Sequence, residues 1–421
     1  MKIFADLEIH SKFSRAVSRE MTPENIDEWS RVKGLNIVGT GDFTHPVWFS
    51  ELKQKLEPVA PGLFQLKKEF QKSRSGQAPY FLLSGEISCV YSKGGKVRKV
   101  HNLIFTPDFE KAEKIIKQLS LIGNLKSDGR PIIGLDSKKL LKILLDISED
   151  NALIPAHVWT PWFGVFGSKS GFDSLEECFD ELTSQVFAIE TGLSSDPAMN
   201  WRMSWLDNKA IVSFSDPHSL HRLGREATVF DIEPSYFDLF KAIKEKNRAN
   251  FLFTVEFFPE GGRYHFDGHR LCGVSFSPEE TKDKKGICPV CAKPLTIGVL
   301  NRIEELASRP ENFNLDGAIP FKRLYPLDEI IAASFNMSSV SSKKVQAEYL
   351  KLVKHFNSEY FILLEASEKE LAGVTSPEIV HGIVSVRQGN VKVLPGYDGE
   401  YGKLSISGSF PVKVDRQTSL F

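Results

Sequence analysis

The sequence predicts an α/β fold whose central sheet closes, or nearly closes, into a barrel. Within residues 1–255, short β-rich apolar runs alternate with helix-like segments, and each run ends in polar or ionisable residues. This alternation favours a parallel sheet, and about seven repeats of the unit favour a barrel over an open sheet. The expected strands span residues 3–7, 35–39, 81–83, 101–105, 152–156, 186–189 and 210–214.

The remaining elements follow from local signals. The first helix is expected to begin after Thr22, an N-cap residue, and to end at Gly34. Beyond residue 255 the composition shifts to Gly, His, Cys and Pro over 256–297, which predicts a small zinc-binding module. Residues 298–405 are mainly helical in pattern, and 406–421 are expected to form a flexible tail.

The composition limits the class of protein. The length of 421 residues predicts two or three domains, while 41% apolar and 25% charged residues argue against a collagenous, disordered or membrane protein. No apolar run approaches about 18 residues and no signal-peptide pattern opens the chain, so we expect a cytoplasmic protein without a membrane partner. The net charge of -1 restricts any nucleic-acid contact to local basic patches.

Ionisable residues gather where the predicted strands end, which is where barrel enzymes place their chemistry. Glu8 and His10 are two apart in a strand, so their side chains share one face. Imidazoles and carboxylates in this number suit two or three divalent ions, which catalyse phosphate-ester hydrolysis by generating hydroxide at neutral pH. The candidate ligands are Glu8, His10, Asp42, Glu86, His101, His157, Asp216 and His218.

A second metal site is expected in the module. Cys288 and Cys291 are separated by two residues, and His269 and Cys272 repeat this spacing sixteen residues upstream. Three thiolates and one imidazole predict a structural zinc, with His265 as an alternative to His269 for the fourth ligand. The other cysteines, Cys89 and Cys178, are expected to be ordinary buried residues.

The motifs of this chain resemble those of the polymerase-and-histidinol-phosphatase (PHP) superfamily and, more closely, of its endonuclease Q family. The matching segments are DLEIHSKFSRAVS, GLNIVGTGDFTHP, HVWTPWFGVFG, IETGLSSDP, SDPHS, YHFDGHRLCGV with CPVC, and PGYDGEYG. The resemblance implies a distorted seven-stranded barrel that holds Zn, Mn or Mg. It gives His10, Asp42, Glu86, His101, His157, Asp216 and His218 the catalytic metal-binding roles. One departure is Glu8, because the superfamily usually has His at this position.

The same resemblance implies cleavage of double- or single-stranded DNA 5′ to uracil, hypoxanthine, xanthine or an abasic site. Such an enzyme needs a pocket for an extruded base and cations for phosphates. Trp159 and Trp162 follow His157 and are expected either to line that pocket or to cover the barrel mouth. The other expected DNA contacts are Thr191, Ser194, Arg222 and Arg225, together with the basic stretches 67–74 and 93–99, for each of which solvated surface is the alternative. The helical region 298–405 is expected to grip the DNA.

The chain ends in Gln417-Thr418-Ser419-Leu420-Phe421, which resembles the pentapeptide by which bacterial DNA enzymes dock on the sliding clamp. Gln417, Leu420 and Phe421 are the expected clamp contacts, and a frayed terminus is the alternative. Two other functions stay open at this stage. A PHP phosphatase would use the same metal cluster on a small phosphomonoester, and a non-catalytic DNA-binding scaffold would explain the unusual Glu8.

Overall fold

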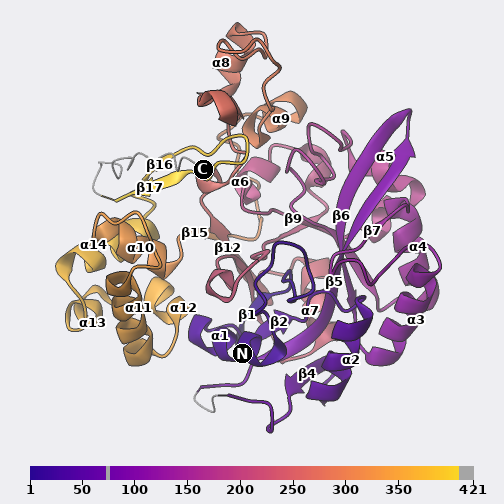
Figure 1. Cartoon of the computed structure of the whole chain (residues 1–421), viewed down its shortest axis with the longest axis horizontal. Helices are drawn as coiled ribbons and strands as arrows, with labels where there is room; N and C mark the ends of the chain where they lie inside the picture. The colour runs from indigo at the N-terminus through magenta and orange to yellow at the C-terminus, as the bar shows by residue number, and fades with distance from the viewer. Residues whose placement is uncertain (73–75, 407–421) are drawn as a thin grey trace, which may run out of the picture.

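The computed structural model describes residues 1–72 and 76–406, so the expected tail contacts Gln417, Leu420 and Phe421 lie outside the described residues. A mixed eleven-stranded sheet forms the centre of the protein (Figure 1). Its main path is β15-β12-β11-β1-β2-β5-β4-β3, and β6, β7 and β8 join through β5 and β6. The strands are β1 (Lys2–Asp6), β2 (Ile37–Gly39), β3 (Leu56–Ala60), β4 (Leu63–Leu66), β5 (Tyr80–Lys93), β6 (Lys96–Thr106), β7 (Ile132–Ile133), β8 (Ala152–Pro155), β11 (Ala227–Asp231), β12 (Phe251–Phe257) and β15 (Phe321–Leu324).

All seven expected strands are present. Five belong to the central sheet as β1, β2, β5, β6 and β8, while β9 (Ala188–Glu190) and β10 (Ala210–Val212) form a separate parallel pair. The prediction of a purely parallel sheet is wrong, because β5 pairs antiparallel with β6, and β6 with β8. A tight turn at Gly94 and Gly95, both with positive φ, connects β5 to β6 as a hairpin. The basic stretch 93–99 is therefore largely a hairpin turn and its flanking strands.

Helices cover the sheet, as Figure 1 shows for α3 and α4 on one side. Their caps follow the sequence signals: the Thr22 side chain accepts from Asn25 N–H at the start of α1, and α1 ends at Gly34 in the left-handed region. In α3, Ala112, Ile115 and Leu119 form the buried face. These helices are α1 (Pro23–Lys33), α2 (Pro46–Lys55), α3 (Phe109–Ser120), α4 (Ser137–Ile147), α5 (Leu175–Phe179), α6 (Pro197–Asn200) and α7 (Tyr236–Glu245).

Residues 267–295 form a small lobe at the top of Figure 1. A short antiparallel pair, β13 (Asp267–His269) and β14 (Val274–Phe276), precedes α8 (Pro278–Asp283). The apolar interior of this lobe is minimal, since its buried cluster consists of Val274, Cys288 and Leu295. Such a small interior cannot stabilise a fold of this kind alone, which agrees with a need for cross-linking by metal.

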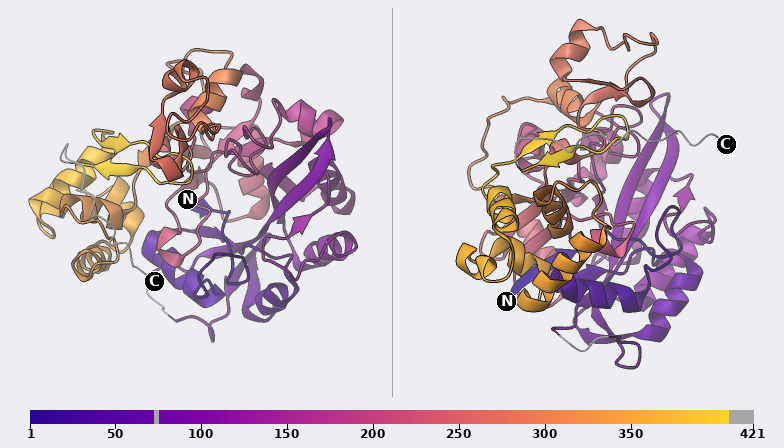
Figure 2. Two further views of the ribbon diagram at one scale, coloured as in Figure 1. Left: turned by 45° about the horizontal axis from the view of Figure 1, so that its top comes forward. Right: turned by 60° about the vertical axis from the view of Figure 1, so that its left-hand side comes forward.

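The C-terminal region starts at α9 (Val299–Leu306) and returns to the central sheet, where β15 lies parallel to β12. It continues as a helical layer on the left of Figure 1 and ends in a hairpin; Figure 2 shows both from two further sides. The elements are α10 (Leu327–Ser334), α11 (Lys343–Phe356), α12 (Glu359–Leu364), α13 (Glu368–Ala372), α14 (Pro377–Arg387), β16 (Lys392–Leu394) and β17 (Lys403–Ser405). Within the described ranges, no helix is long and apolar enough to span a membrane.

Candidate metal centre

The eight candidate ligands come from five parts of the chain and meet at one end of the strands. Glu8 and His10 follow β1, Asp42 follows β2, and Glu86 and His101 lie within the β5–β6 hairpin. His157 follows β8, and Asp216 with His218 follows β10. Seven of these residues fall into three overlapping groups whose donor atoms lie within 4.8 Å of one another, and Asp42 contacts the first group through His10. The groups are His10, Asp216 and His218; Glu86, His101 and His157; and Glu8, Glu86 and Asp216.

Glu86 joins the groups. Its Oε1 contacts His101 Nδ1 and lies 3.3 Å from His157 Nε2, while its Oε2 lies 3.2 Å from His10 Nε2. The carboxyl group is 1% exposed, and burial would raise its pKa, but His101 and Arg130 hold that pKa well below its usual range. The arrangement is that of a bridging carboxylate between two donor sets.

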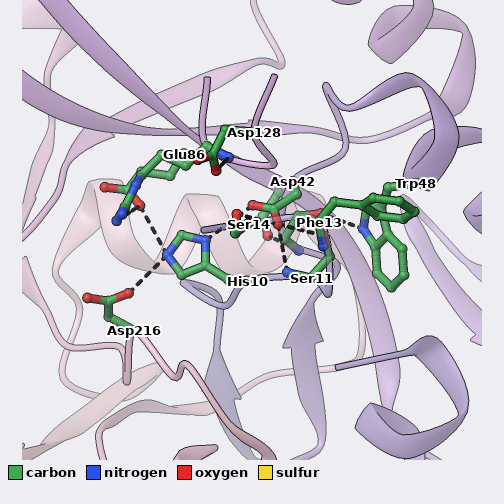
Figure 3. Close-up of polar contacts among 12 residues, drawn as sticks. His10, Ser11, Phe13, Ser14, Asp42, Trp48, Glu86, Asp128 and Asp216 are labelled. Carbon is green, nitrogen blue, oxygen red and sulfur yellow. Dashed lines mark hydrogen bonds and ion pairs between the residues drawn. The ribbon is translucent and has the colours of Figure 1, made fainter. Parts of the chain in front are cut away.

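His10 is held from both ring nitrogens (Figure 3). Its Nε2 faces Asp216 Oδ1 at 3.0 Å and Glu86, while its Nδ1 lies 3.2 Å from Asp42 Oδ1. Asp42 Oδ2 accepts hydrogen bonds from Ser11 N–H at 2.7 Å and from the Ser11 and Ser14 hydroxyls. Asp42 thus lies behind the imidazole, where a carboxylate fixes the orientation and basicity of a metal-binding histidine.

Glu8 differs from its neighbours because no donor satisfies it. Both carboxyl oxygens are buried without a donor among residues 1–72 and 76–406, and the side chain instead faces other carboxyl groups. Burial and then the charges of Glu190, Asp216 and Glu86 raise its pKa well above the usual range. A buried acid without a donor is costly unless a cation or a proton balances it. The residues present therefore fit a cation at this position.

Two residues that contact this centre were not among the sequence candidates. Glu190, the last residue of β9, accepts from His157 N–H and from Gly192 N–H at 2.7 Å, and burial raises its pKa to about 7. Arg130 donates from Nη1 to Glu86 Oε2 at 3.2 Å. The strand-end position of Glu190 was a usable signal, whereas Arg130 lies in a loop with no comparable pattern.

Backbone strain coincides with the centre. Asp42, His157 and Asp216 have φ values of 48°, 30° and 41°, a region that non-glycine residues rarely adopt. The Asp216 loop is held by its N–H to Glu8 O at 3.1 Å and by Arg225, which donates to the Ser215 and Asp216 carbonyls. Such strain is typical of functional sites, where the surrounding structure imposes it.

The predicted zinc ligands also come together. His269, Cys272, Cys288 and Cys291 have donor atoms within 4.8 Å of one another, and Cys291 Sγ lies 3.5 Å from His269 Nδ1. His265 is not in this group; it is buried beside Phe266, and burial lowers its pKa to about 4. The geometry thus selects His269 over His265. Cys89 and Cys178 are buried, and burial raises the pKa of each thiol to about 12.

Two of the residues expected to contact DNA, Trp159 and Thr191, are buried. Trp159 is 1% exposed, donates to Asn200 Oδ1 at 2.7 Å and packs on Phe166, so its ring offers no face to a base. Thr191 is buried and donates to Val212 O or Glu256 Oε2, which leaves no hydroxyl free for DNA.

Of the other four expected DNA contacts, three are buried or paired within the protein, and Trp162 is exposed. Arg222 pairs with Glu329 and lies 3.8 Å from Asp328, so its charge serves the contact with α10. Arg225 is committed to backbone carbonyls, and Ser194 is buried. Trp162 is 37% exposed and packs edge-to-face on Tyr264, so of the six predicted contacts it keeps the most accessible ring.

Comparisons of sequence and structure identify several proteins that this chain resembles. A family model described as the MJ0043 C-terminal domain matches residues 326–390. The protein MJ0043 of Methanocaldococcus jannaschii is 30% identical over 292 residues, which cover 64% of this chain; the match spans 34% of that protein's length. The protein YqxK of Bacillus subtilis is 29% identical over 418 residues, covering 96% of this chain and 99% of YqxK.

Two solved structures match over essentially full length. The crystal structure of a lesion-specific endonuclease from Pyrococcus furiosus has a TM-score of 0.84, with 27% identity and complete coverage of both chains. A complex of endonuclease Q with a 27-mer duplex carrying an abasic lesion at its active site also has a TM-score of 0.84 and 27% identity, covering 99% of this chain and 100% of that one. The fold and the donor cluster define a mixed α/β protein with a candidate metal centre at its strand ends. The family that it resembles over its whole length is endonuclease Q, as the motifs predict.

Proposed function

We propose that this protein is a metal-dependent DNA repair endonuclease that cleaves the phosphodiester 5′ to a deaminated base or an abasic site. The observation that carries the proposal is the full-length likeness to endonuclease Q combined with a buried donor cluster bridged by Glu86. Uracil, hypoxanthine and xanthine are the deaminated bases that we propose. The seven predicted strands would correspond to the distorted barrel of the PHP superfamily.

The donor set suits two or three divalent ions such as Zn, Mn or Mg. When bound, these ions would supply a nucleophile at neutral pH and neutralise charge on the phosphoryl group. The chain's own residues would hold them through His10, Asp216 and His218 on one side and Glu86, His101 and His157 on the other. Asp42 would orient His10, and Glu190 would fix the His157 backbone.

The outer regions would hold DNA. In the zinc lobe, the two ligand-bearing turns expose Leu271 and Val290, which are 86% and 68% accessible. Lys284, Lys285 and Lys293 are exposed on this lobe and have no ion-pair partner among the described residues, so they fit phosphate contacts. Trp162, beside Tyr264 at the base of this lobe, is the proposed ring for a base or sugar.

The proposed partner beyond DNA is the sliding clamp, through Gln417, Leu420 and Phe421. The test compares wild type with the double variant Leu420→Ala, Phe421→Ala. The variant should no longer capture the clamp in a pull-down and should keep its cleavage rate on a short oligonucleotide. Equal capture by both proteins would overturn the docking role.

The decisive test is cleavage of end-labelled DNA with one defined lesion, with and without chelator. Nicking 5′ to hypoxanthine, uracil or an abasic site, lost with chelator and restored by added metal, is the expected result. Hydrolysis of p-nitrophenyl phosphate without DNA nicking would identify a PHP phosphatase instead. Tight DNA binding without either activity would identify a non-catalytic scaffold.

A further inference from the structure

Arg130 is placed at the metal centre by a loop that is tied to both sides of it. Gly129 N–H donates to Phe13 O at 3.1 Å, and Asp128 Oδ1 accepts from the N–H groups of Arg15 and Arg130. On the other side, Ser88 N–H of β5 donates to Pro131 O at 3.0 Å. These bonds fix the loop between the β1 end and the β5–β6 hairpin.

Gly129 allows this approach. A Cβ at residue 129 would lie 2.2 Å from Asp42 Oδ2 and 2.4 Å from Ser14 Oγ, far inside van der Waals contact. Only glycine therefore lets the backbone pack directly on the carboxylate that orients His10. The consequence is that the next residue, Arg130, projects over Glu86.

Acidic side chains outnumber basic ones around Arg130. The centre contains five buried or largely buried carboxyl groups, those of Glu8, Asp42, Glu86, Glu190 and Asp216. Among the described residues, Arg130 is the only arginine or lysine whose side chain pairs with one of these carboxylates. A phosphate entering the centre would meet repulsion from these acids, so a fixed cation beside it has a direct electrostatic effect.

The hydrogen bonds of Arg130 are also incomplete. A guanidinium carries five N–H donors, and within the described ranges the Arg130 side chain uses Nη1 alone, toward Glu86 Oε2. The side chain is 24% exposed, so it is neither sealed in the core nor free in solvent. A guanidinium with unused donors in a fixed plane matches the paired oxygens of a phosphate.

We propose that Arg130 binds the phosphate group that occupies the metal centre, while its contact with Glu86 holds it in place. The inference rests on the proposed function for the identity of the substrate, a DNA phosphodiester next to a lesion. It assigns Arg130 a role in contacting substrate that is separate from holding metal.

The test compares Arg130→Met and Arg130→Lys with wild type on a short duplex carrying one abasic-site analogue. A second duplex replaces the phosphate 5′ to the analogue with a neutral methylphosphonate, and affinity for both is measured by fluorescence anisotropy. Wild type should bind the methylphosphonate duplex about tenfold more weakly, and the difference between the duplexes should be several-fold smaller for Arg130→Met, because the contribution of Arg130 is already lost. Arg130→Lys should recover only part of the lost affinity for the phosphate-containing duplex, since lysine keeps the charge but lacks the planar guanidinium group.

The matched control is Arg248→Met, which removes an exposed arginine from the turn before β12 and should leave both affinities unchanged. Metal content and thermal midpoint are measured for every variant. If Arg130→Met lowers metal content and still discriminates the two duplexes as wild type does, Arg130 only supports Glu86 and the proposal is overturned.

Failure of the proposed function would look different. If wild type nicks no lesion, binding of inorganic phosphate to the metal-loaded protein, measured by calorimetry, decides the role of Arg130 alone. Loss of phosphate binding in Arg130→Met would support the inference for a phosphomonoester substrate. Unchanged phosphate binding would overturn it.

Discussion

Glu86 is the residue on which the centre depends most, because it contacts histidines of two donor groups at once. Glu86→Ala should reduce DNA cleavage by at least about a thousandfold, equivalent to about 4 kcal/mol of transition-state stabilisation, and should lower the bound metal. DNA affinity should fall far less than cleavage, because most contacts with the duplex would lie on the outer surface and not in the cluster. Cleavage kinetics, metal analysis and anisotropy measure the three quantities.

Glu57→Ala is the control for that substitution, since Glu57 is an exposed glutamate of β3 without an ion pair among the described residues. It should behave as wild type in all three measurements. Wild-type cleavage by Glu86→Ala would mean that the proposed active centre lies elsewhere.

Glu8 stands at a position for which the motif resemblance implies His. It is buried without a donor, and its neighbours raise its pKa, so a neutral imidazole that ligates metal would relieve the repulsion among the acids. Glu8→His should therefore maintain or raise the cleavage rate. A loss beyond about tenfold, roughly 1.4 kcal/mol, would show that the carboxylate has a role that imidazole cannot supply. The rate under saturating metal is the measurement.

The sequence patterns led to candidate residues that lie close together in the fold. Six of the eight candidate ligands follow the ends of strands β1, β2, β8 and β10, and Glu86 and His101 face them from within the β5–β6 hairpin. Arg130 escaped prediction because its position depends on how Gly129 packs on Asp42, which no local pattern encodes. The burial of Trp159 and Thr191 could not be predicted, because exposure depends on the tertiary structure around the loop and not on residue type.

At the scale of elements, the sequence predicts that the turns carrying His269, Cys272, Cys288 and Cys291 converge, but it does not predict the β5–β6 hairpin. The spacing of Cys288 and Cys291 sufficed to predict a turn with converging thiols, because the geometry is local. The β5–β6 pairing departs from the predicted parallel sheet, because Gly94 and Gly95 form a tight turn that connects the two strands as a hairpin. The regular alternation of strands and helices therefore overestimated the number of parallel pairs.

The lobe of residues 267–295 leads to a prediction about stability. Its buried apolar cluster is small, so a bound ion should supply much of its folding free energy. Cys288→Ser should remove one zinc equivalent and lower the thermal midpoint, while a residual cleavage rate on a short duplex persists. Cys178→Ser is the matched control, because Cys178 is buried and does not belong to the four-donor group, so its loss should leave the zinc content unchanged. Equal zinc content in both variants would contradict the assignment of the lobe.

At the scale of the whole molecule, the helical layer is fixed to the sheet domain by a buried ion pair. Lys33, the last residue of α1, lies 2.5 Å from Glu359 of α12, and both side chains are below 5% exposed. Glu359 also accepts from the Tyr349 hydroxyl at 2.6 Å and from Leu327 N–H at 2.9 Å, so one carboxylate connects α10, α11 and α12 to α1. Residues 326–390, matched by the family model, include all three helices of this contact.

Removing one partner of this ion pair should destabilise the protein strongly, because it leaves a buried charge without its counter-ion. Lys33→Met should lower the free energy of unfolding by about 3 to 5 kcal/mol, whereas Lys33→Met with Glu359→Gln should recover part of that loss. Lys53→Met is the control: Lys53 and Glu113 are also 2.5 Å apart but about half exposed, so its effect should stay below about 1 kcal/mol. Denaturant unfolding monitored by tryptophan fluorescence and circular dichroism measures all three. If Lys33→Met is as stable as Lys53→Met, apolar packing alone holds the helical layer on the sheet domain, and the carboxylate of Glu359 is adequately satisfied by Tyr349 and Leu327.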